Sequence, residues 1–242
     1  MRLVGLMLTF KIPEQIGEAA AGIKGVDPSD VAFYYDNYSE EMAYNLCNVL
    51  MYISVCFKNP DVKVYSILKD NLKYFVDFFE EYGGRIPELP NKIEEMQVEY
   101  VRLFVSNKDG VPASPYASVY IGKDGLLFSD ELLVLRKLMA DTGFELKEEQ
   151  KDLEDHISIM LEYMSIMIGR LNVDGITALK GFIYVNYRFV LPMVEKFAAK
   201  VRGSTNLTFY ETVAKSLENL VKDMDNVLME VFSYCKFCIY KK

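Results

Sequence analysis

Apolar side chains recur every three or four residues over most of the chain, which is the spacing of one face of an α-helix. Alternation typical of strands is scarce. The pattern predicts helices at about 42–57, 64–79, 93–104, 129–141, 148–171, 182–197 and 208–231. The sequence therefore predicts an all-α protein, built as a single helical domain or as two closely packed helical lobes joined by a long loop.

Several helix ends carry recognisable signals. Ser39 is the expected N-cap of the first helix, and Gly83-Gly84 is expected to end the second, because a helix C-terminus favours a residue with positive φ. The segments 91–94 (NKIE) and 208–211 (TFYE) have the spacing of capping arrangements. We expect each of these two segments to start a helix.

Two segments do not follow the helical pattern. Residues 1–37 are treated as an N-terminal extension, which leaves 38–242 as the helical domain. Residues 106–125 contain three glycines and two prolines with little periodicity, and we interpret them as a long loop. A loop of this length inside a domain is uncommon and is usually functional or a linker. As a hinge it would also allow two copies to exchange lobes, which would give a homodimer.

Composition limits the function classes. The net charge of −8 argues against nucleic-acid binding, which requires clustered Lys and Arg, and it is compatible with a basic partner. No apolar run reaches the roughly 18–20 residues that cross a bilayer, so no stable membrane insertion is expected. Met1 to Phe10 is too short for a convincing signal peptide, so we expect a cytoplasmic protein.

The four cysteines are expected to be reduced thiols. Cys235 and Cys238 have the spacing of half a zinc site. The other two, Cys47 and Cys56, lie nine residues apart on one predicted helix, whereas zinc sites use two close pairs. We therefore predict no metal ion and no other cofactor.

The only histidine, His156, follows Asp155, and Glu162 comes one predicted helical stretch later. On one continuous helix, Asp155, Ile159 and Glu162 would share a face, with His156 on the adjoining face. Such a cluster would be able to transfer protons or hold a metal, but one histidine and two carboxylates on one helix make a poor divalent site. A structural Asp-His pair near a helix start is the alternative interpretation.

The long loop favours peptide binding. Its prolines lower the cost of ordering, and its tyrosines offer amphipathic contact area with few rotatable bonds. The helix after it carries Met160, Met164 and Met167, whose flexible thioethers adapt to varied apolar partners. A tied-down loop beside ordinary core methionines would give the same sequence pattern, so both interpretations stay open at this point.

Ordered motifs in these segments resemble the TorD-like chaperones (TorD, DmsD, NarJ), which assist assembly of molybdenum-cofactor oxidoreductases. The matching blocks are 99–104 (EYVRLF) with 112–120 (PASPYASVY), 132–139 (LLVLRKLM) with 143–144 (GF), and 154–157 (EDHI) with 161–164 (LEYM). The resemblance extends over roughly residues 40–230. It identifies 38–242 as a TorD-like domain.

This resemblance implies an all-helical, cytoplasmic, non-enzymatic protein that binds the twin-arginine leader, the body or both of a molybdopterin oxidoreductase catalytic subunit. The chaperone would hold that subunit for cofactor insertion before export. Carboxylates of the chaperone would bind the paired arginines of the leader. Its tyrosines would contact the apolar part of the leader. The implied peptide- and client-binding residues are Asp155, His156, Tyr116, Tyr120, Glu154, Glu162, Arg102, Phe104 and Pro115.

Two other functions remain as alternatives. One is a helical metal-dependent enzyme that uses Asp155, His156 and Glu162. The other is a permanent structural subunit of a reductase complex.

Overall fold

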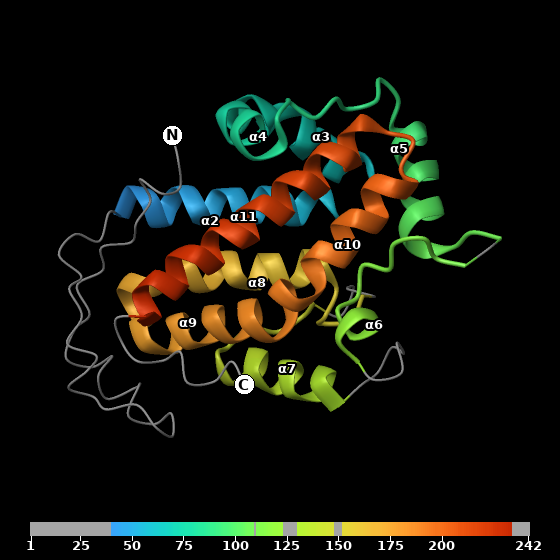
Figure 1. The fold of residues 1–242 in the computed structure, drawn as a ribbon. Coiled ribbons are helices and arrows are strands. Elements are labelled where there is room, and N and C mark those ends of the chain that lie inside the picture. The colour runs from blue at the N-terminus through green and yellow to red at the C-terminus, as the bar shows by residue number, and fades with distance from the viewer. Residues whose placement is uncertain (1–39, 109, 123–129, 148–151, 234–242) are drawn as a thin grey trace.

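The computed structural model describes residues 40–108, 110–122, 130–147 and 152–233. Within these ranges the regular elements are all helices (Figure 1). The expected all-α class is therefore confirmed. The extension 1–37, the N-cap Ser39 and the pair Cys235 and Cys238 lie outside the described residues.

The helices are joined by connections of unequal length, of which the longest lie between Val105 and Ser118 and between Asp141 and Ile157. In chain order they are α2 (Glu40–Cys56), α3 (Val62–Asn71), the 3₁₀ helix η3 (Leu72–Tyr74), α4 (Val76–Gly83), α5 (Ile93–Tyr100), the π-helix η4 (Val101–Val105), α6 (Ser118–Ile121), α7 (Asp130–Asp141), α8 (Ile157–Gly169), α9 (Leu171–Val185), the π-helix η5 (Asn186–Val190), α10 (Leu191–Ser204) and α11 (Thr208–Ser233).

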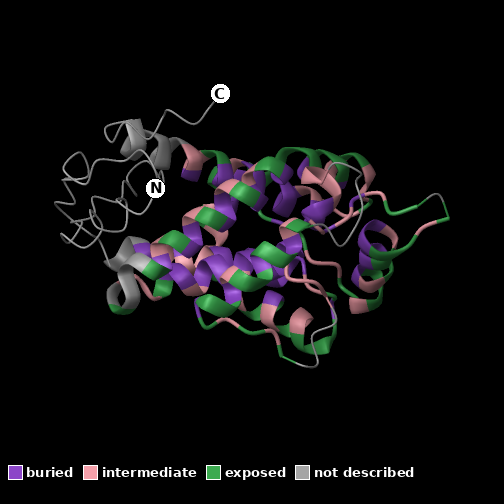
Figure 2. Ribbon diagram, turned by 90° about the horizontal axis from the view of Figure 1, so that it is seen from below, coloured by how far each residue is buried: buried purple, intermediate pink, exposed green. Residues whose placement is uncertain are grey.

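The most buried helix is α8, and the others pack around it. Figure 1 shows α2, α8, α9 and α7 stacked one below another, with α10 and α11 lying diagonally across them; the helix pairs α2–α8, α8–α9 and α10–α11 are in direct contact. Figure 2 shows the buried residues on the facing sides of the helices and the exposed residues outside. This is the arrangement that amphipathic helices adopt around a shared core.

The buried apolar side chains form one contiguous cluster. An aromatic group joins its distant parts: the ring of Phe104 lies 5.1–6.2 Å, centroid to centroid, from the rings of Tyr100, Tyr210, Phe57 and Phe197. These residues come from the beginning, the middle and the end of the described chain. The aromatic group thereby fixes η4 against α10 and α11.

Helix ends agree in part with expectation. Gly84 follows α4 with φ of +77°, as predicted for a C-terminal glycine. The capping arrangement expected at 91–94 is not formed, because Lys92 is the N-cap of α5 and makes no side-chain hydrogen bond there. At α11, Thr208 is the first helical residue and the Glu211 carboxylate pairs with Arg85 of the α4–α5 connection. This contact with a distant connection takes the place of the predicted local cap.

The helix boundaries differ from the sequence prediction in several places. The helix expected at 64–79 is divided by η3. The segment 106–125 contains the short helix α6. The helix expected from 148 begins only at Ile157, after a turn at 152–156. The third difference matters most, because it removes Asp155 and His156 from the helix.

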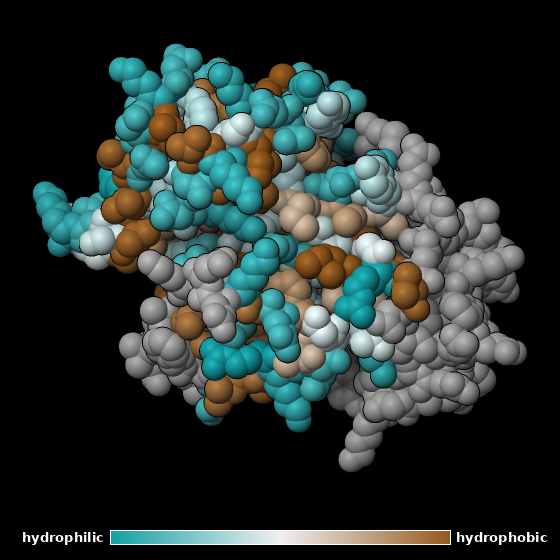
Figure 3. Space-filling view, turned by 180° about the vertical axis from the view of Figure 1, so that it is seen from behind, coloured by the Kyte–Doolittle hydropathy of each residue, from teal (hydrophilic) through white to brown (hydrophobic). Residues whose placement is uncertain are grey.

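No helix among the described residues is long and apolar enough to cross a membrane. Hydrophilic residues cover much of the rear face, with hydrophobic residues interspersed among them (Figure 3). The division at residue 37 and the use of 106–125 as a hinge stay predictions.

Close packing of α4 on α11 gives a test of the fold. A Cβ on Gly83 would lie 2.6 Å from Ser216 Oγ and 2.8 Å from Thr212 Cγ2, so Gly83→Ala should lower the free energy of unfolding by about 1–3 kcal/mol. In α10, a Cβ on Gly203 would meet nothing within 4 Å, so Gly203→Ala should leave stability unchanged or raise it by up to about 1 kcal/mol. Urea denaturation measures both, and equal effects would contradict this packing.

Candidate functional site

Two segments far apart in the sequence meet at the start of α8. Residues 113–121, here called the strap, follow the loop after η4, and residues 152–157, here called the junction, lead into α8. An isolated antiparallel bridge joins Tyr116 to His156. Its backbone hydrogen bonds run from the Ile157 amide to the Pro115 carbonyl (2.8 Å) and from the Ala117 amide to the Asp155 carbonyl (3.0 Å). The structure thus brings the predicted loop and the predicted Asp-His pair into one site.

Asp155 is buried in this site, with 1% of its surface exposed. Its Oδ2 accepts a hydrogen bond of 2.9 Å from the Ser118 amide, whereas its Oδ1 has no hydrogen-bond partner among the described residues. Burial raises the pKa of the Asp155 carboxyl, and the hydrogen bond from Ser118 opposes this shift. Asp155 therefore holds the first turn of α6 but keeps one carboxylate oxygen unsatisfied.

His156 is the N-cap of α8 and is also almost fully buried. Its Nδ1 accepts a hydrogen bond of 3.2 Å from the Ser158 amide and lies 2.8 Å from Ser158 Oγ. Since Nδ1 accepts, the neutral ring carries its proton on Nε2. Burial lowers the pKa of His156 to about 4, so the ring is uncharged near neutral pH.

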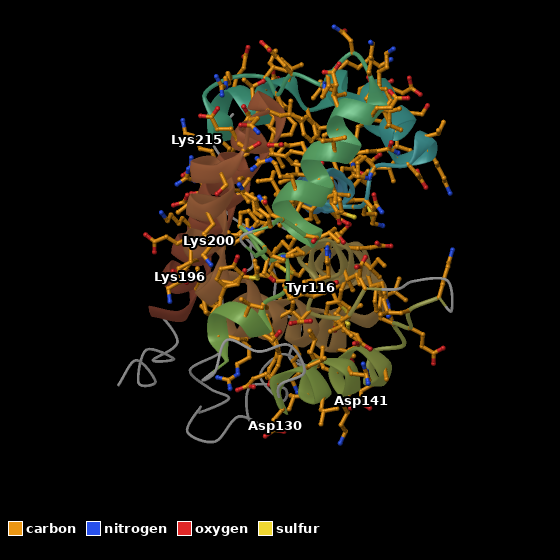
Figure 4. All side chains as sticks on the ribbon, turned by 90° about the vertical axis from the view of Figure 1, so that its right-hand side faces the viewer. Tyr116, Asp130, Asp141, Lys196, Lys200 and Lys215 are labelled. Carbon is orange, nitrogen blue, oxygen red and sulfur yellow. The ribbon has the colours of Figure 1, made fainter. Side chains whose placement is uncertain are left out.

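The two strap tyrosines are held by different groups. The Tyr116 hydroxyl donates to Asp152 Oδ1 at 3.0 Å, and the Tyr116 ring meets the His156 ring edge-on, 5.1 Å between centroids. The Tyr120 hydroxyl donates to the Ser114 carbonyl at 2.8 Å. Burial raises the pKa of both hydroxyls. Both rings are half-buried, so each keeps some surface for a partner. Figure 4 labels Tyr116 at this site.

Two predicted carboxylates are already paired inside the chain. Glu154 forms a bidentate salt bridge with Arg136 of α7, with hydrogen bonds of 2.6 and 3.0 Å. Burial alone would raise the pKa of Glu154, but the hydrogen bonds from Arg136 hold it below its usual range. Glu162 pairs with Lys58 at 2.5 Å. An incoming arginine would have to compete with these cations.

Arg102 belongs to a structural ion pair. It forms a bidentate salt bridge with Glu99, with hydrogen bonds of 2.7 and 2.8 Å, and also donates a hydrogen bond to the Ser204 carbonyl. Glu99 also accepts from the Asn206 amide at 2.5 Å and from the Thr205 hydroxyl at 3.0 Å. Arg102 and Glu99 therefore tie η4 to the connection between α10 and α11.

Phe104 and Pro115 support the site from the core. Phe104 is 4% exposed and packs in the aromatic group, and Pro115 is buried with its carbonyl bonded to the start of α8. Of the two interpretations left open for the methionines of α8, the structure supports ordinary core residues. Met160, Met164 and Met167 are fully buried, because they lie on the sides of α8 that face the core.

The predicted shared helix face of Asp155, Ile159 and Glu162 is also wrong, because Asp155 precedes α8. The described residues contain no group of three His, Cys, Asp or Glu side chains placed to hold a metal ion. The arrangement instead resembles a capped helix start that is covered by a strap.

Sequence reasoning missed several partners in this site. Ser158 has a signal, since it lies two residues after the capping histidine. No sequence signal marks Asp152 or Ser118 as a partner. Asp152 accepts from Tyr116 and Ser118 donates to Asp155 only because of the way the strap crosses the junction.

Replacing Asp155 tests the cost of its burial. The pKa of the Asp155 carboxyl is higher in the folded protein than in the unfolded chain. The stability of the wild type therefore falls as pH rises from the unfolded pKa toward the folded pKa. Asp155→Asn should therefore be more stable than wild type at neutral pH, with the difference shrinking on acidification. Thermal unfolding from about pH 4 to 7 measures this, and a variant that is less stable at neutral pH would contradict it.

The single histidine permits an unambiguous pH titration. With a pKa of about 4, the His156 Cε1–H signal in NMR should not titrate between about pH 5.5 and 8. Because the folded pKa lies below the unfolded value, the contribution of His156 to stability should be lost as pH falls from about 6.5 toward 4. The urea-unfolded chain is the control, and an inflection near 6.5 in the folded protein would show an accessible ring.

Comparison with known proteins places this chain in a family. The family model described as nitrate reductase delta subunit matches residues 69–197. The TorD chaperone of Vibrio parahaemolyticus is 31% identical over 156 residues, which cover 61% of this chain and 71% of the relative. The Tat proofreading chaperone DmsD of Salmonella typhi is 31% identical over 68 residues, 28% of this chain and 33% of that protein.

A solved structure, described as a redox enzyme maturation protein from Archaeoglobus fulgidus, has the same fold. It covers 77% of this chain and 97% of its own length with a TM-score of 0.53 and 20% identity. The chain belongs to the TorD-like family of redox enzyme maturation chaperones. The named relatives are chaperones and not enzymes, which argues against the metal-dependent enzyme.

Proposed function

We propose that this chain is a cytoplasmic chaperone that binds the twin-arginine leader, the body or both of a molybdopterin oxidoreductase catalytic subunit. It holds that subunit for cofactor insertion before export. Membership in the TorD-like family supports the chaperone role. The name of the DmsD relative, a Tat proofreading chaperone, supports a leader peptide as the ligand.

The observation that carries this proposal is the pairing of strap and junction. The residues that the family resemblance implicates, Tyr116 on the strap and Asp155-His156 on the junction, lie side by side although they are distant in the sequence. Asp155 Oδ1 is buried and lacks a partner among the described residues. A guanidinium group would satisfy this oxygen with a charge-assisted hydrogen bond.

Binding at Asp155 requires the strap to move. Asp155 is covered by the first turn of α6, whose Ser118 amide occupies Oδ2. In our proposal, an arginine of the leader replaces Ser118 as the donor, and the strap lifts away from the junction. Tyr116 and Tyr120 then contact the apolar part of the leader, and His156 keeps α8 capped.

Peptide binding tests the proposal. A synthetic peptide with two adjacent arginines followed by an apolar stretch should bind at least about tenfold more tightly than its twin-lysine counterpart, because only arginine makes a two-pronged contact with a carboxylate. Asp155→Asn and Tyr116→Ala should each weaken binding by at least about fivefold, by loss of a charged hydrogen bond and of aromatic contact. Fluorescence anisotropy with a labelled peptide measures the affinities.

Tyr44→Ala is the matched control, because Tyr44 is 68% exposed on α2 outside the site. Circular dichroism of each variant separates lost binding from lost folding. If both peptides bound equally and neither site variant had an effect, the proposed site would be wrong.

A permanent subunit of a reductase complex remains as a second candidate, because the matching family model is named after a reductase subunit. A chaperone leaves its client after assembly. Stable, stoichiometric co-purification with the mature reductase would favour the subunit. Recovery with the immature catalytic subunit alone would favour the chaperone.

A further inference from the structure

A pocket lies on the side of the strap that faces α10. Its volume is about 330 Å³, and it is lined mainly by Tyr120, Ile121, Glu131, Arg188, Pro192 and Lys196. These residues come from α6, α7, η5 and α10, which only the tertiary fold brings together. We call it the basic pocket. Its size is at the lower end of the range for small-ligand sites.

The basic pocket has more basic than acidic lining residues, whereas the whole chain has a negative net charge. Arg188 and Lys196 line it, while the net charge of the protein is −8. The acidic lining residue, Glu131, lies 3.8 Å from Arg188. Lys196 forms no ion pair with any part of the chain that the structure describes. Lys196 is therefore available to an anion.

A second lysine lies next to the pocket, against one of its lining residues. Lys200 lies one helical turn after Lys196, and Figure 4 shows both on the same side of α10. Its Nζ is 5.2 Å from the centre of the Tyr120 ring, a cation–π contact. The Tyr120 ring is fixed by the hydrogen bond from its hydroxyl to Ser114. Tyr120, Ile121 and Pro192 give the pocket an apolar wall beside its charged one.

The backbone at the pocket is unusual as well. Arg188 lies in η5, a π-helical turn between α9 and α10. Single π-turns within helices are rare and are frequent at functional sites. Here the π-turn places Arg188 at the pocket beside Pro192 of the following helix.

We propose that the basic pocket binds an oxyanion, a phosphate or carboxylate group carried on a small apolar body. Lys196 and Arg188 hold the charged oxygens, as lysine and arginine do in other anion sites. The wall formed by Tyr120, Ile121 and Pro192 contacts the body of the ligand.

Such a ligand regulates the leader site, an inference that rests on the proposed function. Tyr120 lies two residues after Ser118, whose amide holds Asp155. A ligand that bridges α6 and α10 keeps Tyr120 against α10 and so keeps the strap over Asp155. The oxyanion therefore competes with the twin-arginine leader by stabilising the closed strap.

The first experiment measures anion binding alone. Inorganic phosphate at constant ionic strength represents a free small anion, and an acetylated diglutamate peptide represents carboxylates presented by a protein. Saturable amide shifts at Ile121 and Lys196 in ¹⁵N NMR, with a Kd on the order of 1 mM for either probe, support the site. The probe that binds more tightly shows whether the anion is a free small anion or a carboxylate presented by a protein. Lys196→Gln and Arg188→Gln should each weaken binding at least about fivefold.

Lys215→Gln is the matched control, because Lys215 is an exposed lysine on α11 on the same side of the molecule (Figure 4). It should bind both probes as wild type does. If neither probe bound saturably, or if Lys215→Gln lost binding as much as Lys196→Gln, the pocket proposal would be overturned.

The second experiment measures the coupling. A saturating amount of the tighter probe should weaken binding of the twin-arginine peptide by about threefold or more in wild type and should have no effect in Lys196→Gln. An unchanged peptide affinity in wild type would overturn the coupling. If wild type bound no leader peptide at all, the proposed function would fail, whereas the NMR titration would still decide on the pocket.

Discussion

The enclosure of α8 is the constraint on which the rest of the structure depends. Most of its residues are buried, including those of its first turn. The first amide groups of a helix have no partner within the helix, and in a buried helix water cannot serve them. The His156 ring therefore accepts from the Ser158 amide, and the Pro115 carbonyl accepts from the Ile157 amide. The need to cap a buried helix draws the strap across the junction and so creates the candidate site.

The polar groups of this site are unequally satisfied. The His156 ring is uncharged because burial disfavours its protonated form. The charged carboxylate of Glu154 is paired with Arg136. Asp155 differs, since one of its carboxylate oxygens lacks a partner among the described residues. A buried carboxylate that is half satisfied lowers stability, and such costs are usually kept where function needs them. This distinguishes Asp155 from the other acidic residues near the site.

The candidate leader site and the basic pocket lie on either side of the same short helix. Ser118, at the start of α6, contacts Asp155, and Tyr120, in the same helix, contacts Lys200 of α10. An acidic group thus lies on one side of the strap and basic groups on the other. A cationic peptide and an anionic ligand would act on the strap in opposite directions, which makes α6 the element through which the two sites are coupled.

Sequence and tertiary structure determined different parts of this protein. Apolar spacing determined the all-α class, and Gly83-Gly84 determined a helix end, because both are local properties of the backbone and its nearest neighbours. Ordered motifs located the candidate site in the strap and the junction. The sequence did not show that α8 starts after His156, that the methionines of α8 are buried, or that Glu154 and Glu162 are paired. Those features depend on which helices pack together, since a cap, an ion pair or a buried face needs partners that the packing brings from distant parts of the chain.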